Sequence, residues 1–235
     1  MSIFAIGDLH LSFGENKPMS IFGDNWQSHE EKIKKDWIEK VQPDDYVLLP
    51  GDFSWAMYLK DSYADFEYLN SLPGKKILLK GNHDYWWETL NKMRNYIKEN
   101  NFKDIDFLSN NSYECEGYII AGTRGWVQSN EEEDKRLVNR ETLRLELSLQ
   151  DGIQKYGEDK PIIVCMHYPP ITNFNLQNQR PSPFMEIMKK YNVQKCIYGH
   201  LHAMAINDAI QGQVDGIDLK LVSADSVDFK LQKII

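Results

Sequence analysis

The sequence lacks an apolar run of about 18 residues or more, the length that indicates a membrane-spanning helix. Its beginning also lacks the basic segment and long apolar stretch of a signal peptide. We therefore predict a cytoplasmic protein without a membrane span.

Cysteine is scarce, with three residues in the chain and no CxxC pair. An odd, scattered set of this kind gives no disulfide framework. Cys165 and Cys196 lie within apolar runs, where a reduced thiol packs as a small hydrophobic side chain. The cysteines therefore favour buried free thiols in a reducing compartment.

The chain has fewer basic than acidic side chains: 27 lysines and arginines compared with 35 aspartates and glutamates, which gives a net charge of −8. An extended nucleic-acid surface needs basic patches, so we expect none. A small nucleotide is not excluded as a ligand, because bound metal ions can dominate the local field. The sequence carries no signal for an oligomeric state.

The length of 235 residues and the hydrophobic content of 42% fit a single α/β domain over residues 1–235. Apolar runs bounded by turn residues predict strands at 2–7, 46–49, 75–79, 105–108, 118–121, 161–166 and 195–198. Helical spacing predicts helices at 28–41, 63–72, 87–99, 131–156 and 182–191. The last two apolar runs, 217–224 and 227–234, predict an antiparallel hairpin that turns at Asp225-Ser226.

Residues 131–156 carry a conflicting signal. Four leucines, at positions 143, 145, 147 and 149, alternate with polar residues as they would in a strand. The flanks are rich in Glu, Arg, Lys and Leu without β-branched runs, so length and propensity favour one helix. The whole pattern predicts an α/β sandwich of two mixed sheets packed face to face, with helices outside and strand carboxyl ends meeting at one edge.

Five of the apolar runs end in residue types that bind metals. These residues are Asp8, His10, Asp52, Asn82, His83, Asp84, His167, His200 and His202. Five of the six histidines belong to this set, whereas His29 falls in the first turn of a charged helix and is expected to be solvated. A single histidine is usually a core residue, but five at successive strand ends point to a metal centre.

The ordered blocks Asp8-x-His10, Gly51-Asp52, Gly81-Asn82-His83-Asp84, His167 and Gly199-His200-x-His202 resemble the calcineurin-like metallophosphoesterase family. The resemblance implies a four-layer α/β sandwich and two divalent metal ions, for which manganese, iron and zinc all suit mixed nitrogen and oxygen ligands. It implies that one ion is held by Asp8, His10, Asp52 and His202, and the other by Asp52, Asn82, His167 and His200.

The implied reaction is hydrolysis of a small phosphate ester, either a phosphodiester or a phosphomonoester, by attack of a metal-bridging hydroxide. His83 lies outside both ligand sets, and the family assigns it to the leaving group. Asp84 either orients His83 or caps the following helix. The alternative function is a metal-binding scaffold or regulatory module that has lost turnover, although the non-ligand His83 favours the enzyme.

The residues that follow Gly51-Asp52 indicate which members of the family this chain resembles. Phosphoprotein phosphatases carry Gly-Asp-x-Val-Asp-Arg-Gly there, whereas this chain has Gly51-Asp52-Phe53-Ser54-Trp55. The missing aspartate and arginine argue against phosphoprotein substrates. The chain more closely resembles the compact bacterial phosphohydrolases and phosphodiesterases.

Several residues near the blocks are candidates for substrate binding. Trp86 and Trp126 either stack on the substrate or pack the loops that hold the metals. Arg124 either contacts phosphate through its guanidinium group or forms an ordinary salt bridge. The loop at 169–180 either covers the site or simply connects two elements.

Overall fold

The computed structural model describes all residues from 1 to 235 and contains two β-sheets. The first has the order β11-β1-β2-β3-β4, and the second β5-β6-β7-β8-β10-β9. The first sheet is built from β1 (Ile3–Ala5), β2 (Tyr46–Pro50), β3 (Lys75–Leu79), β4 (Ile105–Leu108) and β11 (Gln232–Lys233). The second is built from β5 (Tyr113–Cys115), β6 (Tyr118–Thr123), β7 (Ile162–Met166), β8 (Lys195–Tyr198), β9 (Gly212–Val214) and β10 (Ile217–Leu221).

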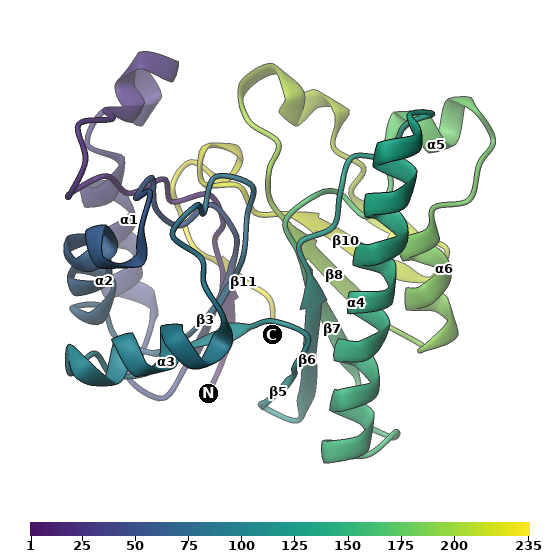
Figure 1. The fold of residues 1–235 in the computed structure, drawn as a ribbon, viewed down its shortest axis with the longest axis horizontal. Helices are drawn as coiled ribbons and strands as arrows, with labels where there is room; N and C mark the ends of the chain where they lie inside the picture. The colour runs from purple at the N-terminus through teal and green to yellow at the C-terminus, as the bar shows by residue number, and fades with distance from the viewer.

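Helices cover the outer face of each sheet (Figure 1). The first sheet carries α1 (His29–Lys40), α2 (Tyr63–Asn70) and α3 (Leu90–Glu99), and the second carries α4 (Glu132–Tyr156) and α6 (Pro183–Lys190). The predicted four-layer α/β sandwich is therefore confirmed. No helix has both the length and the apolar character needed to cross a membrane.

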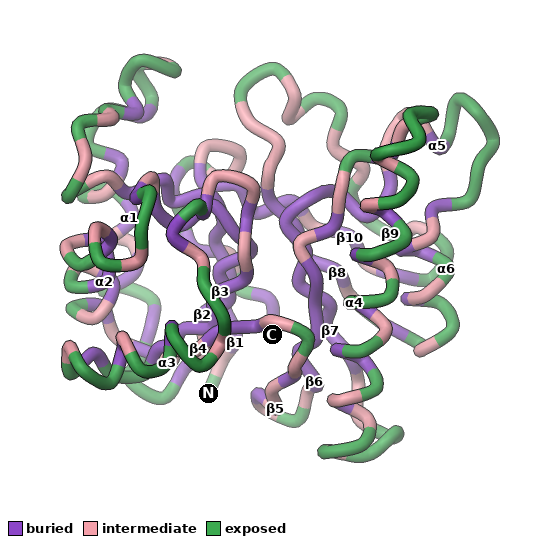
Figure 2. The backbone as a smooth tube through the Cα atoms, in the orientation of Figure 1, coloured by how far each residue is buried: buried purple, intermediate pink, exposed green.

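The strands are apolar on both faces because each face is covered. In β7, Ile163 and Cys165 point into the core between the sheets, whereas Val164 and Met166 pack against the helical layer. This alternation follows from the two-residue period of a strand. The central strands are buried, and the exposed positions lie mainly on helices and loops (Figure 2).

The long segment at 132–156 is a single helix of 25 residues, as predicted. Leu145 and Leu149 are fully buried against the second sheet, whereas Leu143 and Leu147 are 62% and 54% exposed. The alternating leucines therefore do not mark a strand. The polar loop that follows β7 contains one short helix, α5 (Asn173–Gln177), which its sequence did not predict.

The predicted C-terminal hairpin is wrong. β10 pairs with β8 in parallel and with β9 antiparallel, whereas β11 crosses to the first sheet and pairs with β1. Asp225 does not lie in a hairpin turn. It belongs to a short 3-10 helix, Ala224–Val227, in the segment that connects β10 of the second sheet to β11 of the first. Apolar alternation predicts that a segment is a strand, but it does not specify which strand becomes its neighbour.

Candidate metal centre

Seven polar side chains meet at the carboxyl edge of the two sheets, where parallel strands of an α/β fold place their sites. They follow β1, β2 and β3 in the first sheet and β7 and β8 in the second. The set consists of Asp8, His10, Asp52, Asn82, His167, His200 and His202. The structure therefore brings together every residue that the sequence suggested as a ligand.

Two groups of donor atoms form within this set. In the first, the Nε2 atom of His202 lies 3.2 Å from Asp8 Oδ1 and 3.4 Å from the Nε2 atom of His10. In the second, the Oδ1 atom of Asn82 lies 2.6 Å from His167 Nε2 and 2.9 Å from His200 Nδ1. Each group offers nitrogen and oxygen donors that face one another, as first-row divalent metals require.

Asp52 lies between the two groups. Its Oδ2 atom is 3.8 Å from His10 Nε2 in the first group and 3.5 Å from His167 Nε2 in the second. One carboxylate thus reaches both sets of donors.

The electrostatics of the centre follow from burial. Burial, together with the adjacent Asp8 carboxylate, raises the pKa of Asp52 to about 8. Burial lowers the pKa of His200 to about 3. Burial opposes protonation of His202 as well, but Asp8 and Asp225 outweigh it and raise the pKa of His202 to about 10. Two buried carboxylates side by side and the neutral imidazole of His200 are groups that a divalent cation would stabilise.

Two glycines lie so close to carboxylates of the donor set that no larger residue fits at these positions. A Cβ atom at Gly81 would overlap the Asp52 carboxylate, and one at Gly199 would overlap that of Asp8. The backbone is also unusual at the ligands themselves, since four of them have positive φ: Asp8 at 58°, His10 at 46°, Asp52 at 51° and His200 at 72°. Non-glycine residues adopt this region at a cost, and such strain is concentrated at functional sites.

Two contacts outside the ligand set orient its imidazoles. The Nδ1 atom of His167 lies 3.0 Å from the carbonyl oxygen of Pro50, and that of His202 lies 2.7 Å from Asp225 Oδ1. Each contact directs Nε2 toward the centre, as is usual for metal-binding histidines. The sequence did not point to Asp225, because it follows β10 in a segment that resembled a turn.

A comparison with protein families matches residues 1–204 to the calcineurin-like phosphoesterases. The chain belongs to this family. Membership implies a metal-dependent phosphoesterase. Two clusters of this centre, Asp8–His10–His202 and Asp8–Asp52–His167, are suited to hold a metal ion.

Two solved structures resemble this chain along nearly their whole length. A protein of unknown function from Aquifex aeolicus, AQ665, is 18% identical with a TM-score of 0.52, and the match covers 99% of this chain and 95% of that one. TT1561 from Thermus thermophilus is 16% identical with a TM-score of 0.58, and the match covers 98% of this chain and 96% of that one. At these identities the likeness supports the fold alone. A comparison with curated proteins gives no match.

Asp84 has a structural role in the loops around the centre. Its buried carboxylate accepts five N–H donors, which are the backbone amides of Asp52, Phe53, Ser54 and Gly81 and the indole of Trp86, at 2.7 to 3.2 Å. It makes no hydrogen bond to the His83 ring, and Thr89 caps α3. Neither role suggested by the sequence is seen, because the carboxylate is occupied in joining the loops after β2 and β3.

His83 lies beside the centre and outside both donor groups. Its ring centroid is 4.5 Å from that of Trp55 and 5.7 Å from that of His10. The backbone N–H of His83 donates to Asp52 Oδ1 at 2.8 Å, which fixes the residue next to the candidate bridging carboxylate. The ring itself makes no hydrogen bond, and its Nδ1 atom is buried without a partner.

The two tryptophans suggested as substrate contacts lie in different surroundings. Trp86 is 1% exposed and packs edge-on against Phe66, which fits the packing alternative. Trp126 lines a cavity of about 410 Å³ together with Tyr168 and the ligand His200. Trp126 therefore remains a candidate for substrate contact, whereas Trp86 packs inside the fold.

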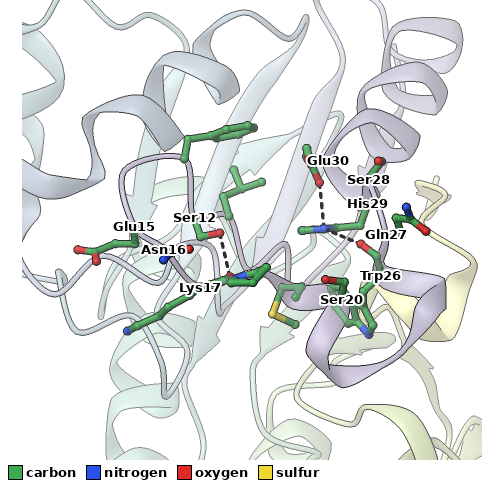
Figure 3. Close-up of a pocket in the computed structure, with 14 residues that line it drawn as sticks. Ser12, Glu15, Asn16, Lys17, Ser20, Trp26, Gln27, Ser28, His29 and Glu30 are labelled. Carbon is green, nitrogen blue, oxygen red and sulfur yellow. Dashed lines mark hydrogen bonds and ion pairs between the residues drawn. The ribbon is translucent and has the colours of Figure 1, made fainter.

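His29, which we expected to be solvated, is buried and 6% exposed. Its Nδ1 atom lies 3.2 Å from the carbonyl oxygen of Trp26 (Figure 3). Its Nε2 atom lies 2.9 Å from the carbonyl oxygen of Leu9. The Trp26 ring in turn lies 6.0 Å from His10 and 5.7 Å from His202, centroid to centroid. His29 thus supports Trp26, whose ring packs beside His10 and His202 of the first donor group. The sequence did not predict this role, because the neighbours of His29 in the helix are charged.

We expect Asp84→Ala to lower the free energy of unfolding by about 3 kcal/mol or more, because several buried N–H donors lose their acceptor together. Chemical denaturation measures the change. Asp44→Ala is the matched control, since the Asp44 side chain is 75% exposed. A stability equal to that of the control would contradict the anchoring role.

We expect Asp225→Ala to weaken metal binding about 10- to 100-fold, because His202 loses the group that orients it. Calorimetric titration with manganese or zinc measures the affinity, and circular dichroism confirms that the fold is retained. Unchanged affinity would show that the contact with Asp225 is not needed to position His202.

Proposed function

We propose that the protein hydrolyses a small phosphate ester, a phosphodiester or phosphomonoester, with the help of two divalent metal ions. The observation that carries the proposal is the position of Asp52 within 4 Å of donor nitrogens in both groups. A carboxylate placed in this way can bridge two ions. Family membership supports the reaction class independently.

The chain's residues divide between two proposed sites. One ion is held by Asp8, His10, Asp52 and His202, and the other by Asp52, Asn82, His167 and His200. Two such ions, of manganese, iron or zinc, supply a nucleophilic water at neutral pH and positive charge for the phosphate oxygens. Asp225 and the Pro50 carbonyl keep the imidazoles in the orientation that leaves Nε2 free for coordination.

His83 is proposed to act on the leaving group. It is fixed next to Asp52 through its backbone, while its ring has no hydrogen-bond partner. The imidazole can therefore donate a proton or a hydrogen bond to the oxygen that departs from phosphorus. A free imidazole beside a complete ligand set favours turnover over a silent scaffold.

The organic part of the substrate is proposed to occupy the cavity beside Trp126. This cavity adjoins His200 and includes the aromatic rings of Tyr168 and Phe174. Aromatic walls of this kind bind flat or apolar groups. Phe174 belongs to α5, so the loop after β7 contributes to the wall of this cavity.

A panel of phosphate monoesters and diesters, assayed with manganese, iron and zinc in turn, tests the proposal. Release of phosphate or alcohol that depends on added metal is the expected result. Absence of turnover with every ester and metal, in protein that binds the ions, would favour the scaffold function.

Asp52→Asn is expected to lose at least one metal ion per chain, because an amide is a weaker ligand and carries no charge to share between two cations. Elemental analysis after dialysis measures the ions retained. Asp228→Asn, at a side chain that is 81% exposed, is the control. Two ions bound at wild-type affinity would rule out the bridging role.

His83→Asn is expected to keep both ions while kcat for an alkyl ester falls by about 10²- to 10⁴-fold, the usual contribution of general acid catalysis. A nitrophenyl ester should lose less, because nitrophenolate departs without protonation. Loss of metal would make His83 a ligand instead. Equal losses for both esters would indicate a role in binding the phosphate.

A further inference from the structure

A second cavity of about 510 Å³ lies at the same edge of the sheets, between the ends of β3, β4 and β6 and the side of α4. Four basic side chains line it: Lys80, Arg124, Arg140 and Arg144. Only two acidic side chains do, Glu88 and Glu141. The lining therefore has an excess of positive charge, although the whole chain has a net charge of −8.

The acidic residues of this cavity are already paired. The Glu141 side chain is 1% exposed, and its Oε1 atom lies 2.8 Å from Arg144 and 3.0 Å from Arg140. Its Oε2 atom accepts a hydrogen bond from the Thr123 hydroxyl at 2.7 Å. Glu88 pairs with Lys92 at 3.1 Å, away from the four basic residues. Neither carboxylate is left to neutralise a further cation.

Lys80 and Arg124 are the cations without a partner. Neither has a carboxylate within 4 Å or a hydrogen bond from its side chain, and the Arg124 Nε atom is buried without an acceptor. The Arg124 guanidinium carbon lies 4.6 Å from the centre of the Trp126 ring, which holds the group in place. A fixed guanidinium with a free N–H and a neighbouring ammonium group form a receptor for phosphate.

Two residues of this cavity are linked to the metal centre through the backbone. Lys80 directly precedes Gly81-Asn82, and the Arg124 carbonyl accepts the backbone N–H of His167 at 3.2 Å. Asn82 and His167 belong to the same donor group. A substrate with one phosphate at the metals can therefore extend a second anionic group toward the cavity.

We propose that the cavity between Lys80 and Arg124 binds a second phosphate group of the substrate, so that the preferred substrates are organic bisphosphates. The inference rests on the proposed function for its catalytic part, but the anion site itself can be tested without turnover. Arg124 is then a specificity residue that contacts the distal phosphate.

The first test is calorimetric titration of the metal-free protein, kept in chelator, with inorganic phosphate. Binding is expected in the wild type and should weaken at least about tenfold in Lys80→Met and in Arg124→Gln, since each removes a charge-assisted contact. Arg136→Gln is the matched control, because this arginine lies on α4 with its side chain 79% exposed. Equal binding in all four proteins, or no binding in any, would overturn the proposal.

The second test compares butane-1,4-diol bisphosphate with butyl phosphate in the metal-loaded enzyme. The ratio of their kcat/KM values is expected to favour the bisphosphate in the wild type and Arg136→Gln, and to fall about tenfold or more in Lys80→Met and Arg124→Gln. Turnover of both esters with no preference in the wild type would overturn the second-phosphate proposal and leave the phosphoesterase intact.

The two tests separate the two proposals. Phosphate binding that depends on Lys80 and Arg124, in a protein that hydrolyses no ester, would keep the anion site and reject the proposed activity. Phosphate binding without a preference for the bisphosphate would identify free phosphate, and not a substrate group, as the ligand of the cavity.

Discussion

The carboxylate of Asp84 is the interaction on which the centre depends most. It gathers backbone amides from the loop after β2 and from the loop after β3, and it adds the indole of Trp86. A buried carboxylate is costly unless hydrogen bonds compensate it, and here five donors do so. Asp52 and Asn82 lie on the two loops that the Asp84 carboxylate joins. The distance between these two candidate metal ligands is therefore set by a residue that does not itself belong to the donor set.

The packing of the two sheets supplies the other half of the site. The core between them is apolar, with residues such as Ile77, Ile120 and Ile163 contributed by both sheets. Each sheet ends in only part of the donor set, since Asp8, His10, Asp52 and Asn82 follow strands of the first sheet and the remaining histidines follow strands of the second. The two parts of the donor set meet only when the sheets pack together. Burial of the apolar side chains between the sheets therefore brings the donor atoms together at the carboxyl edge.

Much of the fold and the ligand set could be predicted from sequence because both rest on local signals. Apolar runs of strand length end in Asp, Asn or His, and parallel strands bring such ends to one edge. Contacts between distant segments were not predictable in this way. Asp225 supports His202, and β11 leaves its expected hairpin for the other sheet. His29 is buried, and its Nε2 atom lies against the carbonyl oxygen of Leu9 in the loop after β1. In each of these cases the deciding partner lies outside the local sequence pattern.

Donor groups that span both sheets also couple ion binding to the assembly of the sandwich. An ion held by Asp8 and His202, or by Asn82 and His167, would tie one sheet to the other at the edge where their strands end. By mass action, a ligand bound only by the native state stabilises it in proportion to the logarithm of the free ligand concentration. The melting temperature should therefore rise with free metal and fall in chelator, which makes thermal stability a measure of ion occupancy.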